Sequence, residues 1–168
     1  MKLGALLLSL FGGGLLKDLT AGELRLSVPR AWTVVPNSQL LLELHVGKNG
    51  DRGVLQISRL GADGVSALTD KDLGAAAVKF GEVNGRRGQN WGRAAGSKQV
   101  PCTMGQLGMA IFAGGEFPSM VVWLTVSSSS AYLWTWLGPD PVAGELEDAV
   151  KAVMGATVSS QKTAPLKP

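Results

Sequence analysis

The sequence has few of the residues that metal and redox chemistry require. Its 168 residues include a single cysteine, Cys102, and a single histidine, His45. One cysteine excludes an internal disulfide and any multi-cysteine zinc or iron–sulfur site, and one histidine excludes a site with two histidine ligands. We therefore expect neither a metal nor a cofactor.

Charge is also scarce, because only 17% of the residues are charged and the formal net charge is +3. The excess of positive charge lies near the two ends of the chain. Without Lys2, Lys17, Lys162, Lys167 and Asp18, the remaining residues include equal numbers of basic and acidic side chains. A neutral body attracts nucleic acid or anionic lipid only weakly, so we expect no nucleic-acid partner.

The N-terminal apolar run is too short to cross a membrane. Leu3–Phe11 is nine residues long, whereas a spanning helix needs about 20. The segment 1–22 is either a short signal peptide cleaved after Gly14 or a short helix packed through Leu6, Leu7, Leu10 and Phe11. We expect a cytoplasmic protein that is not integral to a membrane, with export to the periplasm as the alternative. A domain over residues 23–158 and a disordered tail over 159–168 follow.

Glycine and apolar residues are abundant, with 23 glycines and 45% hydrophobic residues. Alternating apolar residues predict strands, and the Asn-Gly pair in the loop Gly47–Gly53 predicts a hairpin. The expected strands are Glu23–Val28, Leu40–Val46, Val54–Leu60, Trp91–Val100, Met104–Ala113, Phe117–Ser127 and Ala131–Leu137.

Two segments change to helical spacing. Thr69 and Asp72 form a start signal for a helix over Asp70–Phe80, which Gly81 should close. A second helix should end at Gly155. The apolar stripes of these helices should be buried against the sheet: Leu73, Ala76, Phe80, Leu146, Val150 and Val153. The order of elements predicts one α+β domain, a largely antiparallel curved sheet flanked by two helices.

No residue pattern for catalysis stands out. His45 shares a strand face with Glu43 and could act with it as an acid–base pair. The alternation of these polar residues with Leu42 and Leu44 fits an ordinary surface strand better. No serine lies in a nucleophile-elbow turn, and Cys102 has no basic neighbour in sequence to lower its pKa. We therefore expect no catalytic residue and no enzyme.

Aromatic residues are few, 6% of the chain, but several should lie together. Tyr132, Trp134 and Trp136 alternate along one strand and therefore share a face. Trp123 joins them if its strand pairs as a hairpin across Ser127–Ser130. We call this surface the aromatic face. If the two helices cover one face of the sheet, the aromatic face is either covered by another part of the chain or binds an apolar partner. The second alternative makes Trp123, Tyr132, Trp134 and Trp136 the partner-binding residues.

Two short motifs resemble a known fold. Val28–Trp32 (Val-Pro-Arg-Ala-Trp) is similar to the opening strand motif of the PsbP-like fold. Leu55–Arg59 (Leu-Gln-Ile-Ser-Arg) resembles a strand of one bacterial branch, which includes the Eag-type chaperones of type VI secretion effectors. The resemblance covers roughly Glu23–Val158. It implies a curved antiparallel sheet flanked by helices, no known catalysis, and protein partners.

These observations lead to one expected function and one alternative. The expected function is a non-enzymatic protein-binding domain, such as a chaperone or adaptor for a secreted effector or another protein with apolar segments, and a homodimer is left open. The alternative is an exported domain that binds a lipid or a small apolar ligand.

Overall fold

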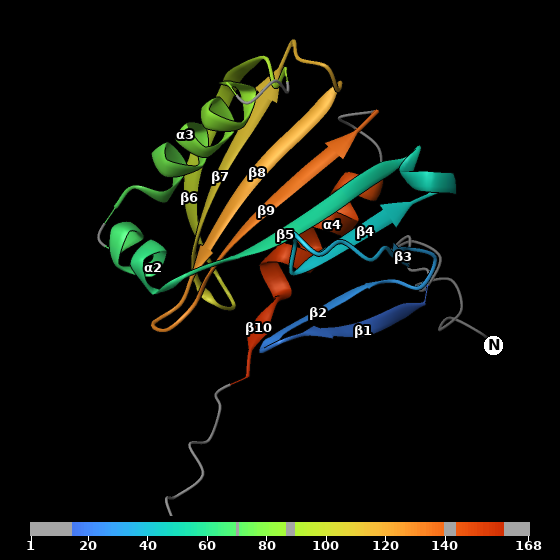
Figure 1. Cartoon of the computed structure of the whole chain (residues 1–168), viewed down its shortest axis with the longest axis horizontal. Coiled ribbons are helices and arrows are strands. Elements are labelled where there is room, and N and C mark those ends of the chain that lie inside the picture. Colours follow the sequence, from blue (N-terminus) through green and yellow to red (C-terminus); the bar gives the residue numbers. More distant parts are fainter. Residues whose placement is uncertain (1–14, 70, 87–89, 140–143, 160–168) are drawn as a thin grey trace, which may run out of the picture.

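The main body of the protein is a seven-stranded antiparallel sheet. A computed structural model describes residues 15–69, 71–86, 90–139 and 144–159, without the side chains of 84–86. The strand order is β3–β4–β5–β9–β8–β7–β6, as Figure 1 shows. This arrangement confirms the predicted α+β class. The strands are β3 (Thr33–Val34), β4 (Leu42–Val46), β5 (Gly53–Leu60), β6 (Arg93–Cys102), β7 (Gly105–Ala113), β8 (Ser119–Val126) and β9 (Ala131–Gly138).

A second, three-stranded sheet consists of β1 (Leu16–Ala21), β2 (Leu24–Pro29) and β10 (Thr157–Val158). β1 lies within the segment 1–22, for which the sequence predicted a signal peptide or a helix. The residues on which that prediction depended, the apolar run Leu3–Phe11 and the cleavage site after Gly14, lie outside the described residues. β1 pairs with β2 along its whole length, although its side chains are exposed or only partly buried. Because few of its side chains are buried, β1 shows little alternation of apolar and polar residues, and the sequence pattern did not predict it.

In the described residues, three helices accompany the sheets: α2 (Ala62–Leu68), α3 (Leu73–Arg86) and α4 (Gly144–Gly155). The predicted loop after β4 contains a 3₁₀ turn at Lys48–Gly50. α2 was not predicted, and it explains why the start of α3 was misplaced. The Thr69 hydroxyl donates a hydrogen bond to the Val65 carbonyl and so ends α2. Asp72 caps α3, because its Oδ1 accepts a hydrogen bond from the Ala75 amide. Asp70 lies outside the described residues.

Gly81 does not close α3, which continues through it to Arg86. Its role is close packing: a Cβ atom at Gly81 would lie 2.0 Å from Cζ of Phe112 on β7. Likewise, a Cβ atom at Gly108 of β7 would lie 2.1 Å from the Leu73 carbonyl oxygen. α3 therefore lies directly against β7, and we call this side of the sheet the α3 face.

The expectation that both helices cover one face was wrong. α3 packs on β6, β7 and β8, whereas α4 packs on β2, β5 and β9 from the other side (Figure 1). α4 and the three-stranded sheet together cover the aromatic face. Of the six helix residues that we expected to be buried, Leu73 and Val153 are buried and the other four are partly buried.

Candidate functional site

The histidine and carboxylate singled out in the sequence are in contact. His45 Nε2 lies 2.7 Å from Glu43 Oε1, and their side chains are 21% and 12% exposed. Asn37 and Gln56 donate hydrogen bonds to Glu43 Oε2 at 2.8 and 3.3 Å. Burial by itself would raise the pKa of Glu43, but the hydrogen bonds from His45, Asn37 and Gln56 lower it below its ordinary value. The carboxylate is thus held ionised by polar neighbours on the strand surface.

Nothing in the described residues completes this pair into a nucleophilic or metal site. No group of three or more histidine, cysteine or acidic side chains lies close enough to hold a metal ion in the part of the chain that the structure describes. Cys102 is a free, partly buried thiol on β6. The contacts of His45 and Glu43 match those of a satisfied polar cluster on a strand face.

The aromatic residues come together as the spacing predicted. β8 and β9 form an antiparallel hairpin with Trp123 opposite Trp134. The Trp134 indole nitrogen donates a hydrogen bond to the Thr125 hydroxyl at 2.8 Å. The ring of Trp136 lies 5.9 Å from that of Trp32, which precedes β3.

These rings do not form an open surface. Trp123, Tyr132, Trp134 and Trp136 are at most 1% exposed. Of the two alternatives for the aromatic face, the geometry agrees with the covered one, because α4 and β2 pack on this side of the sheet. The rings are part of the larger hydrophobic core, and any role in binding a partner stays a prediction.

Partly buried apolar residues pack at the border of this core. Met109 lies on β7, and Leu146, Val150 and Met154 lie on one stripe of α4. The Thr103 amide donates a hydrogen bond to the Met154 carbonyl, which fastens the end of α4 beside the β6–β7 turn. We call these four residues the apolar margin.

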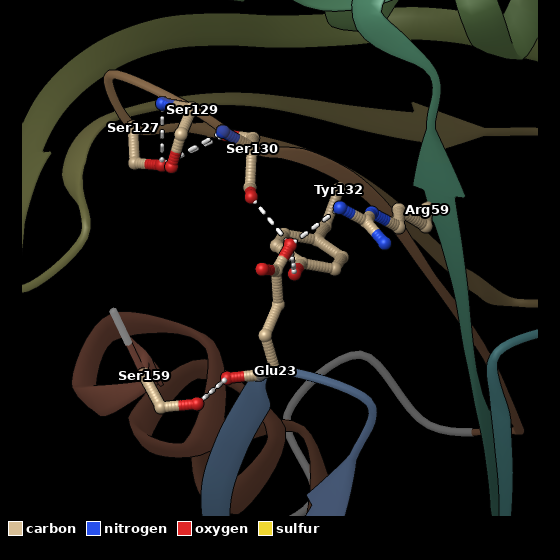
Figure 2. Close-up of polar contacts among 7 residues, drawn as sticks. All are labelled: Glu23, Arg59, Ser127, Ser129, Ser130, Tyr132 and Ser159. Atoms are coloured by element: carbon tan, nitrogen blue, oxygen red, sulfur yellow. Dashed lines mark hydrogen bonds and ion pairs between the residues drawn. The ribbon is translucent and has the colours of Figure 1, made fainter. Parts of the chain in front are cut away.

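Glu23, which no sequence pattern singled out, links the three-stranded sheet to the large sheet (Figure 2). Its carboxylate accepts hydrogen bonds from Ser130 at 2.6 Å and Tyr132 at 3.3 Å, and it pairs with Arg59 at 2.6 Å. Its backbone carbonyl accepts hydrogen bonds from Ser159, just after β10. The hydrogen bond from Ser130, with help from Arg59 and Tyr132, lowers the pKa of Glu23 despite partial burial.

A cavity of about 490 Å³ opens beside the start of α4. Pro29, Ala31, Trp32 and Val46 supply its apolar lining, and Arg52, Glu145 and Asp148 supply its charges. Arg52 and Glu145 form an ion pair. Burial raises the pKa of Asp148. The volume lies within the range of small-molecule sites.

No helix in the described residues is long and apolar enough to cross a membrane.

Comparison with known proteins identified the fold. The chain matches no protein family and no curated protein. Among solved structures, it is similar to the solution structure of cyanobacterial PsbP (CyanoP) from Synechocystis sp. PCC 6803, with a TM-score of 0.65. The two sequences are 11% identical, and the match covers 88% of this chain and 96% of CyanoP. The protein thus has a PsbP-like fold, as the resemblance of Val28–Trp32 predicted.

Proposed function

We propose that this protein is a non-enzymatic protein-binding domain, a bacterial chaperone or adaptor for a secreted effector or another protein with apolar segments. The apolar margin carries this proposal. Its aliphatic and methionine side chains on α4 and β7 are partly exposed and pack against the aromatic core. Methionine adapts to differently shaped apolar surfaces, and buried aromatic rings give such a surface a firm base.

The buried position of the four rings changes how a client would bind. An apolar segment would first contact Met109, Val150 and Met154, which pack against the core cluster that contains Trp123 and Trp134. In this arrangement Trp123, Tyr132, Trp134 and Trp136 support the client-binding surface. Direct contact with these rings would require α4 to shift.

Binding of an apolar helix by the purified full chain tests the proposal. The probe is a fluorescently labelled apolar peptide of 20 residues, followed by anisotropy. Val150→Glu should weaken binding at least tenfold, about 1.4 kcal/mol, because it puts a charge into the apolar margin. Glu147→Gln, on the exposed side of α4, should leave binding unchanged. Thermal melting of both variants checks that they fold.

Two outcomes would refute this function. One is the absence of saturable binding to the wild-type chain, and the other is equal affinity for the wild type and a folded Val150→Glu variant. We place the client-binding protein in the cytoplasm, and sedimentation of the peptide-free chain would show whether it is a homodimer.

The cavity beside α4 favours one alternative, an exported domain that binds a lipid or a small apolar ligand. Trp32 and Val46 would contact the ligand's apolar part, and Asp148 or Arg52 its polar end. A mature chain in the periplasm that begins near Leu15 would support export. Saturable binding of a fluorescent fatty acid, weakened by Val46→Glu but not by Val150→Glu, would favour the cavity over the apolar margin.

A further inference from the structure

The two edges of the seven-stranded sheet are protected very differently. The β3 edge is only two residues long, whereas β6 at the other edge has ten residues. Seven consecutive residues of β6, Arg93–Gln99, are exposed. No strand in the described residues pairs with the outer side of β6. Long edge strands with free backbone groups can pair with another chain, and proteins usually shorten or cover them.

The usable part of this edge is short and well defined. The register between β6 and β7 shifts between Ala94 and Gly96, and such a bulge interrupts regular pairing. At the other end, Pro101 has no amide hydrogen to donate. The segment between them, Gly96–Val100, is five residues long, which is an ordinary strand length.

Gly96 leaves a space without a side chain on β6, on the face of the sheet that carries the aromatic core. Gly96 pairs with Ile111 on β7, and Ile111 is 42% exposed. A Cβ atom at Gly96 would meet no atom within 4 Å. A large side chain on an added strand opposite Gly96 could therefore reach across the glycine to Ile111.

The positive charge of β6 favours an acidic residue in a partner segment. Lys98 is two residues from Gly96, on the same strand face, and is exposed. β6 also carries Arg93, and no acidic residue occurs from Arg93 to Cys102. Opposite charges directly across two strands stabilise their pairing, and like charges destabilise it. A second copy of β6 brings cations and no acid in any register, so self-pairing is disfavoured.

We propose that β6 binds an extended segment of a partner protein by adding it as an eighth strand to the sheet. The partner segment has an apolar side chain opposite Gly96 and an acidic side chain opposite Lys98. In an antiparallel pairing its sequence reads acid, any residue, apolar residue. This proposal rests on the proposed protein-binding function and gives it a second surface, distinct from the apolar margin.

The test uses two labelled nine-residue peptides and the full chain. Both peptides are threonine-rich and extended, with isoleucine two positions after a glutamate in one and after a lysine in the other. The glutamate peptide should bind the wild-type chain more tightly by anisotropy. Hydrogen exchange should slow at backbone amides within residues 96–100.

Variants of two exposed lysines make the test specific. Lys98→Glu should weaken the glutamate peptide at least tenfold and should strengthen the lysine peptide. Lys79→Glu is the matched control, because it makes the same charge change on the exposed side of α3 and should alter neither affinity. Ile111→Thr should weaken both peptides, while thermal melting confirms that every variant folds.

Three results would overturn the proposal. The first is equal affinity of the glutamate peptide for the wild type and for Lys98→Glu. The second is a peptide that slows hydrogen exchange at amides outside residues 96–100. The third is a dimer of the peptide-free chain in which hydrogen exchange at this edge is already slow. The last result would assign β6 to a second copy. The apolar 20-residue peptide separates the two proposals, because it should still bind Lys98→Glu if only the β6 proposal fails.

Discussion

The two faces of the large sheet are covered in opposite ways. On the aromatic face, Trp123, Tyr132, Trp134 and Trp136 fill the space beneath α4 and a second sheet. On the α3 face, small residues of the helix and the sheet meet, so that α3 lies close to β7. These small residues are Gly74, Ala77, Gly81, Gly108 and Ala110.

This difference shows how residue size sets the distance between layers. Large rings maintain a thick core under a cover built from separate parts of the chain. Glycines let a single helix approach the strands, and any added atom there meets backbone or ring atoms at once. The aromatic face should thus be sensitive to loss of volume, and the α3 face to gain of volume.

The largest expected effect is the loss of a ring from the aromatic face. Trp134→Ala should lower the free energy of unfolding by about 3–5 kcal/mol, because the ring is fully buried and hydrogen-bonded to Thr125. Urea unfolding measures this loss. Phe117→Ala is the control, since Phe117 is among the exposed large residues, and it should change stability by less than about 0.5 kcal/mol. A stable Trp134→Ala variant with weaker client binding would instead support direct contact with the ring.

A single methyl group should be enough to disturb the α3 face. Gly108→Ala should destabilise the protein by about 1–3 kcal/mol, because the new Cβ atom would lie 2.1 Å from the rigid Leu73 carbonyl oxygen. Gly96→Ala is the matched control on the open edge strand and should change stability by less than about 0.5 kcal/mol. Equal urea midpoints for the two variants would show that α3 can move away from β7 without cost.

The aromatic ring of Phe80 on α3 should contribute less to stability than the sequence pattern indicated. Phe80 is only partly buried, so Phe80→Ala should cost about 1–2 kcal/mol, less than a fully buried ring. Urea unfolding decides this too. A loss above about 3 kcal/mol would mean that Phe80 is as deeply buried as the rings of the aromatic face.

The sequence predicted the features that depend on neighbouring residues. Alternation along β9 placed Tyr132, Trp134 and Trp136 on one face, and the hairpin brought Trp123 opposite Trp134 as expected. Prediction from the sequence failed for features that depend on contacts between segments far apart in the chain. Nothing near α4 in the sequence indicates which face of the sheet the helix covers, so the aromatic face was treated as a candidate groove.

Gly81 and Glu23 also have roles that depend on residues far away in the sequence. A glycine that ends a helix and one that lets a helix pack closely look alike in sequence, and only Phe112 on β7 distinguishes these roles for Gly81. Glu23 binds Ser130 and Tyr132, which are 107 and 109 residues away. Such long-range polar contacts leave no local pattern.

The smallest expected effect concerns the polar contacts that hold the cover on the aromatic face. The pKa of Glu23 is lowered in the folded protein. Its carboxylate therefore stabilises the fold above the ordinary glutamate pKa of 4.5, and this contribution disappears as the pH falls through the lowered value. Glu23→Gln should reduce stability at pH 7, and its difference from wild type should shrink with acidification below about pH 4.5.

Glu147→Gln is the control for this pH dependence. Lys151 lowers the pKa of Glu147 in the same direction, but both side chains of that ion pair are largely exposed. Exposed pairs contribute little to stability, so this variant should follow the wild type at every pH. Urea unfolding between pH 3 and 7 compares the three proteins. If the gap between wild type and Glu23→Gln is constant over this range, the ionised Glu23 carboxylate does not fasten the three-stranded sheet. Apolar packing, including that of Leu24, Leu26 and Val28, then holds the cover on the aromatic face without help from the carboxylate.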